Sequence, residues 1–258
     1  DPKGRITARK VAAPFILRRT KSQVLTDLPP KEENNVYLIF SDEERQRYLS
    51  ELLFIRKKIQ ESPSKRKYGE ILSGLLKLRQ LCLWQNEQST KIDFLMENLE
   101  QILQEGHQVI VFSQFTTYLD IIEGRVLKNH WKYSRVDGSQ NIKKRQEQVE
   151  LFQDGKNRLF LISLKAAGVG LNLTAASYVF LMDPWWNPAV ESQAIDRAHR
   201  IGQRNPLTVY RPIIKDSVEE KVLDLQETKR QLFNELLPDQ DMYFSGKLST
   251  QDFEHLFD

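Results

Sequence analysis

The sequence of 258 residues contains a single cysteine, Cys82, and only four histidines. One cysteine excludes an internal disulfide framework and fits a reducing compartment. The cysteine and the histidines show no metal-ligand spacing, so we expect no metal site in the chain. No apolar run approaches the roughly 18 residues that a membrane span needs, and no signal peptide is visible, so no membrane partner is expected.

The sequence also lacks the motifs with which a chain binds and hydrolyses a nucleotide unaided. The phosphate-loop pattern G-x-x-x-x-G-K-[ST] is absent, because the two Gly-Lys pairs continue with Asn157 and Leu248. No acidic run follows an expected strand to hold Mg²⁺, and the G-x-S-x-G elbow of serine hydrolases is missing. The chain alone is therefore expected to be unable to complete a reaction. It begins with Asp1 rather than Met, which indicates a piece of something longer.

Composition is ordinary for a globular protein, with 40% hydrophobic and 28% charged residues. The net charge of +3 is too small to argue by itself for a nucleic-acid partner. The length suits one large α/β domain with appendages, or two small domains.

From Lys91 onward, short apolar runs alternate with helical patterns. Strands are expected over 109–112, 133–136, 159–163, 178–182 and 207–211. Helices are expected over 91–105, 116–129, 141–153, just after Lys165, and over 188–200. Strands that are apolar throughout and alternate with helices indicate the α/β class, with a parallel sheet covered by helices on both faces.

Two helices before this region are expected to form a protruding hairpin. A strand over 36–40 leads into a capping box, Ser41 to Glu44, and a helix over 42–60; a second helix follows over 68–83. The basic turn between them, ESPSKRK, is open to a plainer interpretation as a solvated surface loop. A long helix over 216–236 and a short appendage over 238–258 are expected at the other end.

Small polar residues follow four of the expected strands. The groups are Ser113-Gln114, Asp137-Gly138-Ser139, Ser163-Leu164-Lys165 and Asp183–Asn187. In an open parallel sheet, ligands bind at the carboxyl ends of the strands, so these residues are candidates for a site. Capping of the following helices is the alternative, since Ser and Asp are good N-caps.

The stretch from Ser163 to Gln203 carries the most specific pattern. Gln193, Arg197 and Arg200 stand at i, i+4 and i+7 on the expected helix over 188–200, so they share one face. Two arginines on a rigid helix can bind the terminal phosphates of a nucleotide. Surface ion pairs with nearby acidic residues are the alternative. Arginine fingers without a phosphate loop imply that the nucleotide is bound by another lobe.

These residues resemble a known family. Motifs V and VI of the SWI/SNF-type remodelling ATPases, in helicase superfamily two, are closely similar to SLKAAGVGLNLTAA, DPWWNPAVE and QAIDRAHRIGQ. VIVFSQF resembles motif IV, and VDGSQNIKKRQEQVELF resembles the element after it. FILRRTKSQVLTDLPPK resembles the segment that joins the two lobes, and KLRQLC resembles a helix of the protruding insertion. The resemblance covers the chain except the tail after about residue 237, and the wording is closest to bacterial members.

The resemblance implies the second, C-terminal RecA-like lobe of a two-lobed motor. It divides the chain into an interlobe linker (1–33), a strand with a helical protrusion (34–90), the RecA-like lobe (91–215), a brace helix (216–237) and a tail (238–258). The first RecA-like lobe of the same protein is then a partner of this chain. ATP and its Mg²⁺ would be bound mainly by that first lobe.

The resemblance also assigns candidate site residues. Arg197 and Arg200 would act catalytically as fingers on the ATP phosphates, with Gln193 and Gly170 lining the cleft. Double-stranded DNA would lie across both lobes, and the carried-over backbone contacts are Ser113, Gln114, Gly138, Ser139, Lys165, Trp186 and Asn187, with Lys143 adding charge. Plain core filling is the alternative for Trp186. One departure is Ala167, where the family usually has glycine.

The expected function is therefore the C-terminal motor lobe of an ATP-dependent double-stranded DNA translocase or remodeller, acting on a protein–DNA complex. Two alternatives remain at this point: the lobe of a strand-separating DNA or RNA helicase, and an inactive DNA- or partner-binding module. The expected location is the cytoplasm with the bacterial nucleoid, or the nucleus if the source is eukaryotic.

Overall fold

The computed structural model describes residues 28–85, 89–168, 170–185, 187–236 and 255–257. Six strands form one sheet in the order β1-β6-β5-β2-β4-β3, and every neighbouring pair is parallel. The strands are β1 (Lys31–Leu38), β2 (Val109–Ser113), β3 (Tyr133–Val136), β4 (Leu159–Ser163), β5 (Tyr178–Leu181) and β6 (Leu207–Ile214). The expected α/β class with a parallel sheet is confirmed.

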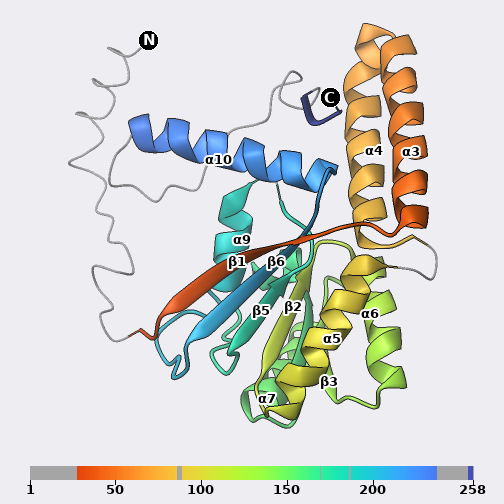
Figure 1. The fold of residues 1–258 in the computed structure, drawn as a ribbon. Coiled ribbons are helices and arrows are strands. Elements are labelled where there is room, and N and C mark those ends of the chain that lie inside the picture. The colour runs from red at the N-terminus through yellow and green to blue at the C-terminus, as the bar shows by residue number, and fades with distance from the viewer. Residues whose placement is uncertain (1–27, 86–88, 169, 186, 237–254, 258) are drawn as a thin grey trace.

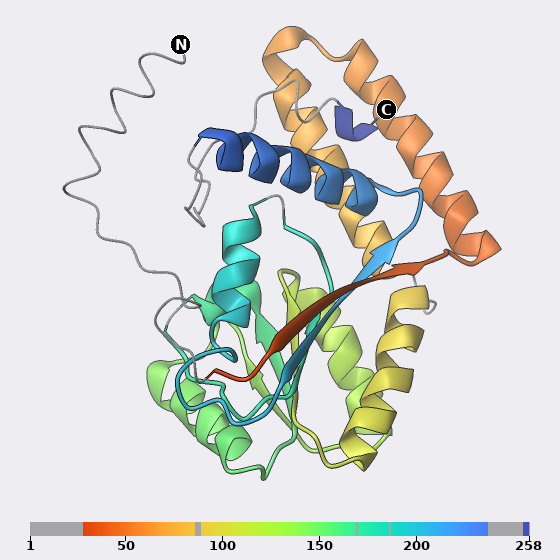
Figure 2. The same cartoon turned by 60° about the vertical axis from the view of Figure 1, so that its left-hand side comes forward.

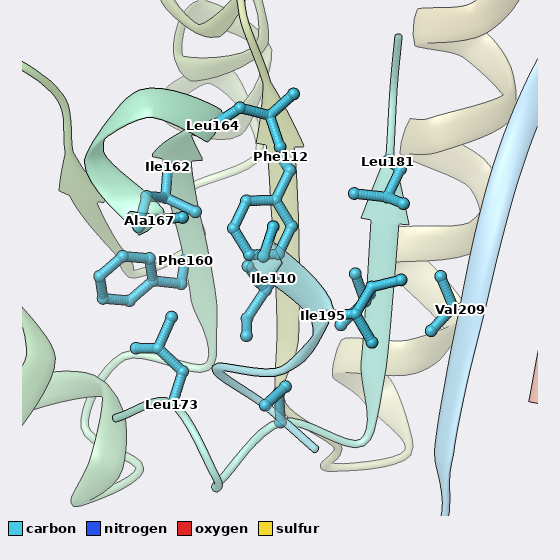
Figure 3. Packing of buried hydrophobic residues seen from close by; sticks show 14 of the residues in the cluster. Ile110, Phe112, Phe160, Ile162, Leu164, Ala167, Leu173, Leu181, Ile195 and Val209 are labelled. Atoms are coloured by element: carbon cyan, nitrogen blue, oxygen red, sulfur yellow. The ribbon is translucent and has the colours of Figure 1, made fainter. Parts of the chain in front are cut away.

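The central strands are covered on both faces because their side chains alternate between two cores. Ile110 and Phe112 of β2 pack with α7 (Ile142–Gln153), α8 (Leu164–Ala167) and α9 (Pro188–Ile195) on one face (Figure 3). On the other face, Val109 and Val111 pack against two further helices, α5 (Thr90–Gln104) and α6 (Thr116–Lys128). All five residues of β2 are buried, which explains why its sequence reads as a continuous apolar run.

Two long helices, α3 (Asp42–Glu61) and α4 (Ser64–Leu83), form the expected hairpin and project beyond the sheet (Figures 1 and 2). The Ser41 hydroxyl caps α3 and Glu44 bonds back to Ser41, so the capping box is confirmed. The second helix begins four residues earlier than expected. Pro63 is its N-cap, a position at which the missing N–H of proline removes no hydrogen bond within the helix. Because the helix begins at Ser64, the basic turn is partly helical.

The helix α10 (Val218–Leu236) crosses one end of the sheet and begins against the hairpin (Figure 1). Its residues Val218 and Val222 belong to a third core that includes buried side chains of α3 and α4. A 3-10 turn, η2 (His255–Phe257), joins the same core through Leu256 and Phe257. The described end of the expected appendage is therefore packed on the hairpin; residues 238–254 of it lie outside the described residues.

The strand before the hairpin, β1, joins the main sheet as its edge strand beside β6, and these two strands differ from the expected bounds. The β1 strand begins at Lys31 rather than 36, and β6 continues to Ile214 rather than ending at 211. The two strands pair along eight residues, from Lys31 with Leu207 to Leu38 with Ile214. The strand that was grouped with the protrusion thus forms an edge of the main sheet. The expected linker lies mostly outside the described residues, which begin at Leu28.

Replacing Phe257 by alanine is expected to lower the free energy of unfolding by about 3 kcal/mol, because a buried phenylalanine leaves a cavity. Phe257 is 5% exposed, and its ring lies against the face of α4 at Gly74. Urea denaturation of the 258-residue chain measures the change. Phe54 on α3, which is 62% exposed, is the matched control and is expected to change stability by less than about 0.5 kcal/mol on replacement by alanine. Equal effects of the two substitutions would contradict the packing of η2.

Candidate nucleotide and DNA interface

Four parallel strands end side by side and bring the predicted polar groups to one edge of the sheet, here called the carboxyl edge. Ser113 at the end of β2 is level with Ser163 at the end of β4, and Phe112 is level with Leu181 of β5. The β3 strand ends beside β4, with Val136 level with Ile162. The residues that follow these strands therefore come together as predicted from the topology.

Ser113 and Gln114 have different environments. Ser113 is fully buried, and its hydroxyl donates to the carboxylate of Asp183. The backbone N–H of Gln114 donates to the same carboxylate at 3.1–3.2 Å, while the Gln114 residue is half-buried. The serine thus holds the turn from inside. Gln114 is the less buried residue of this pair, although its side-chain nitrogen is buried and has no hydrogen-bond partner among the described residues.

Asp183 is the buried anchor of this turn, and its carboxyl group is fully enclosed. Burial raises the pKa of Asp183 to about 7, even though the Arg79 charge, the Ser113 hydroxyl and the Gln114 N–H all favour the ionised form. Such a carboxylate is held by its hydrogen bonds and its neighbouring charges rather than by water.

The loop after β3 is tied down by Asp137. Its carboxylate accepts hydrogen bonds from the backbone N–H of Ser139 at 2.9 Å and from the Ser139 hydroxyl at 2.5 Å. Burial raises the pKa of Asp137, but these hydrogen bonds and the charge of Arg135 outweigh it and leave the pKa below the ordinary value. Gly138 and Ser139 are exposed, and so is Lys143 in the first turn of α7.

Lys165 is exposed on the single turn α8, which the Ser163 hydroxyl caps by accepting from the N–H of Ala166 at 3.3 Å. Ala167, which replaces the usual glycine, is buried. Its carbonyl remains available and accepts a hydrogen bond from Arg197. Gly170 is exposed and has a φ of 68°, a conformation that favours glycine.

The helix with the two arginines is shorter than expected. It ends at Ile195, so the prediction that Gln193, Arg197 and Arg200 project from one continuous helix is wrong. Tertiary hydrogen bonds end the helix: the Arg197 carbonyl accepts from the N–H of Leu173 at 2.9 Å, and the ring of His199 bonds the Pro29 carbonyl at 2.9 Å. Arg197 and Arg200 instead lie on the turns that follow α9.

The two arginines remain candidates for phosphate binding in this arrangement. The Nε of Arg197 donates to the Ala167 carbonyl at 2.9 Å, which orients the half-buried guanidinium, and Arg200 and Gln193 are exposed. Among the described residues, neither arginine forms an ion pair. Glu191, an acidic residue close to both arginines in the sequence, pairs with Arg211 at 3.1 Å instead.

Two family models match the chain: an SNF2-related domain over residues 2–89 and a helicase conserved C-terminal domain over residues 90–202. The chain belongs to the SNF2-related helicase family. The family resemblance is therefore confirmed. Because its solved relatives include isolated C-terminal domains, the chain is the C-terminal lobe of an SNF2-type protein.

Relatives of this SNF2-type lobe include an uncharacterized ATP-dependent helicase of Mycoplasma pneumoniae, 39% identical over 95% of this chain and 24% of that protein. The chain spans about a quarter of the length of such curated relatives. The Sulfolobus solfataricus SWI2/SNF2 ATPase core in complex with dsDNA is 32% identical, with a TM-score of 0.72 over 97% of this chain and 55% of that chain. The C-terminal domain of the Sulfolobus ATPase is 29% identical, with a TM-score of 0.69 over 88% of this chain and 97% of that one.

The DPWWNP segment of the lobe is fixed on both sides of Trp186, which itself lies outside the described residues. The backbone N–H of Trp185 donates to Glu191 at 2.7 Å, and the Trp185 ring lies 5.2 Å from the guanidinium of Arg79. Asn187 is half-buried, and its side chain caps α9 by accepting from the N–H of Ala189 at 3.0 Å. The capping interpretation therefore holds for Asn187 and leaves its amide nitrogen for another partner.

Sequence reasoning missed Arg79 and the anchoring role of Asp183. Arg79 is 1% exposed and donates to the Pro184 carbonyl at 2.6 Å. A signal was present, because Arg79 continues the buried face of Ile71 and Leu75 at a spacing of four residues. A charged residue on the apolar face of a helix points to a buried polar partner.

No helix within the described residues is long and apolar enough to cross a membrane. In the same part of the chain, His, Cys, Asp and Glu side chains form no group of three or more that could hold a metal ion. The carboxyl edge offers exposed cations and amides, which suit phosphates presented from outside the lobe.

Proposed function

We propose that this SNF2-type lobe is the C-terminal motor lobe of an ATP-dependent translocase on double-stranded DNA. The observation that carries the proposal is the pair Arg197 and Arg200. Arg197 bonds the Ala167 carbonyl in the turn after β4, Arg200 is exposed three residues further on, neither is ion-paired within the described residues, and the sequence has no phosphate loop of its own. The full protein is then a DNA-dependent ATPase whose site is completed between two lobes.

The nucleotide side of the site uses residues of the glycine turn, the segment between Ala167 and Leu173 that contains Gly168 and Gly170, and of the turns after α9. The bond from Arg197 Nε to the Ala167 carbonyl fixes the guanidinium plane and leaves its terminal nitrogens to donate to phosphate oxygens. Arg200, Gln193 and Gly170 complete this surface. The first lobe supplies the phosphate loop and the Mg²⁺, which neutralises charge on the phosphates.

The DNA side uses the neighbouring turns of the carboxyl edge. The proposed contacts are Gln114, Gly138, Ser139, Lys143, Lys165, Trp186 and Asn187, with Ser113 acting from inside through Asp183. Such amides, hydroxyls and cations grip phosphates without reading sequence, as a translocase requires. The solved Sulfolobus ATPase core with bound dsDNA supports this side of the proposal.

Arg197 also offers a route by which the two sides communicate. Its side chain bonds Ala167 and its carbonyl accepts from Leu173, so both ends of the glycine turn are tied to one arginine. Lys165, a proposed DNA contact, lies on the same single-turn helix as Ala167. Movement of Arg197 toward a phosphate would therefore shift the turn that carries Lys165.

Nucleotide turnover by the full two-lobed protein tests this function. We expect double-stranded DNA to stimulate ATP hydrolysis strongly, while single-stranded DNA and duplex RNA stimulate it weakly. Preferential stimulation by single strands or by RNA would favour a strand-separating helicase. Absence of turnover with every nucleic acid, although DNA is bound, would favour the inactive binding module.

We propose that the full protein acts on a protein–DNA complex, in the bacterial nucleoid or, for a eukaryotic source, in the nucleus.

The long helix α10 acts as the brace between this lobe and the first. Its first turns are already anchored in the core of the hairpin, which gives the brace a fixed base.

A further inference from the structure

A buried ionic network lies directly beneath the proposed DNA contacts. Arg79 on α4 and Asp183 after β5 are 1% and 0% exposed at their side chains, with Nη2 and Oδ1 3.9 Å apart. The same Nη2 donates to the Pro184 carbonyl at 2.6 Å. Neither residue reaches the surface, so neither can touch DNA.

Arg79 also contacts the two aromatic residues that flank the proposed contacts. Its guanidinium lies 5.8 Å from the ring centre of Phe115, next to Gln114, and 5.2 Å from that of Trp185, next to Trp186. Cation–π contacts of this kind gain strength when they are shielded from water. One side chain of the protruding hairpin thus holds both turns.

The network extends to the brace helix. The Lys91 ammonium, fully buried, donates to the Met182 carbonyl and to Glu219 of α10, both at 2.7 Å. Glu219 in turn accepts from the backbone N–H of Ile214 at 3.0 Å. The short segment from Met182 to Trp185 is therefore fixed by α4, α5 and α10 together.

We propose that Arg79 and Asp183 are positioning residues that hold the Gln114 turn and the DPWWNP turn in the arrangement that grips DNA phosphates. The inference rests on the proposed function for its ligand, the phosphate backbone of duplex DNA. It adds that the protruding hairpin, through Arg79, sets the DNA affinity of the lobe without touching DNA.

Physical chemistry favours positioning over stability as the reason for this pair. Buried ion pairs are often replaced by apolar residues at no loss of stability. An apolar pair could not supply the acceptors that Asp183 gives to Ser113 and Gln114. Lysine could not replace Arg79 either, because a point charge on a flexible stem lacks the planar group that lies over two rings.

The first test replaces Arg79 by lysine in the full two-lobed protein. We expect the concentration of double-stranded DNA that gives half-maximal ATPase stimulation to rise about tenfold, the loss of roughly one charge-assisted hydrogen bond. The DNA-free turnover and the maximal turnover stay unchanged. Lys77, exposed on the same helix, is the control, and its replacement by methionine leaves DNA saturation unchanged. A folded Arg79→Lys variant with parental DNA saturation would overturn the proposal.

The second test uses Asp183→Asn and pH. Asp183 is faced by Arg79 from α4, Lys91 from α5, Ser113 from β2 and Tyr118 from α6. Lys91 is paired in turn with Glu219 from α10, and the pKa of Asp183 lies near 7. Protonation removes an acceptor, so the half-saturating DNA concentration of the parent should rise as pH falls from 8 to 6. We expect the asparagine variant to show a flat profile over this range. Identical profiles in parent and variant would contradict the proposal.

Hydrogen exchange separates this inference from the proposed function. In Asp183→Asn, the amide of Gln114 should exchange faster while the amides of β2 keep their protection. If the parent shows no DNA-stimulated turnover, the proposed function fails, and this exchange result still reports on positioning. Loss of the folded state in both variants would assign the pair to stability and overturn the inference.

Discussion

Replacement of Arg197 or Arg200 by alanine in the full two-lobed protein is expected to lower ATP turnover by a factor of about 10³ to 10⁵, the range known for arginine fingers. The reason is that each guanidinium is expected to donate to charge that develops on the transferred phosphoryl group. Steady-state hydrolysis at saturating double-stranded DNA measures the effect. In Arg200→Ala, affinity for DNA is expected to stay within about threefold, because Arg200 does not belong to the proposed DNA surface. In Arg197→Ala, DNA is still expected to bind, with a larger loss of affinity because the bond to Ala167 near Lys165 is removed.

Arg204, nine residues after the end of α9, offers a matched control. Arg204 is exposed, follows Gln203 and takes no part in the proposed nucleotide surface. Arg204→Ala should keep parental turnover. Near-normal turnover in Arg197→Ala and Arg200→Ala would remove the finger assignment, whereas equal losses in all three variants would indicate a general effect of charge.

Replacement of Lys91 by methionine is expected to lower the free energy of unfolding of the chain by about 3–5 kcal/mol. Lys91 and Glu219 are both 0% exposed at their side chains, and their charged groups are 2.7 Å apart. Removing the cation leaves the glutamate charge buried without its partner, and the Met182 carbonyl loses its donor. Urea denaturation monitored by circular dichroism gives the change.

The double variant Lys91→Met with Glu219→Gln should recover part of this loss, because it removes the unpaired charge. Lys128, exposed in the last turn of α6, is the control, and its replacement by methionine should change stability by less than about 0.5 kcal/mol. A Lys91→Met chain as stable as the parent would show that the buried pair does not hold α10 to the lobe.

Much of the fold could be predicted because its strands are short apolar runs with helical patterns between them. The β2 and β4 strands are buried along their whole length, and such runs have few other interpretations. Strand ends were less certain where one face meets the solvent. The first residues of β1, from Lys31 to Asn35, are polar and exposed, and only pairing with β6 makes them a strand.

The residues of the candidate site remain predictions, and the structure corrects part of their expected geometry. Local pattern suggested a helix to residue 200, but the bond from Leu173 N–H to the Arg197 carbonyl draws the chain into a turn. No local signal encodes that bond. The same holds for Arg79 and the Pro184 carbonyl, which are separated by 105 positions in the sequence. Partners of buried charges depend on tertiary structure, so sequence shows only that a partner is needed.

We propose that this lobe helps the full protein to translocate along duplex DNA without separating its strands, and displacement of a third strand tests this most directly. The full protein is incubated with ATP and a duplex that carries a triplex-forming strand, and in parallel with a forked duplex. We expect ATP-dependent release of the third strand, no separation of the forked duplex, and loss of release in Arg197→Ala. Separation of the forked duplex without release of the third strand would contradict the account.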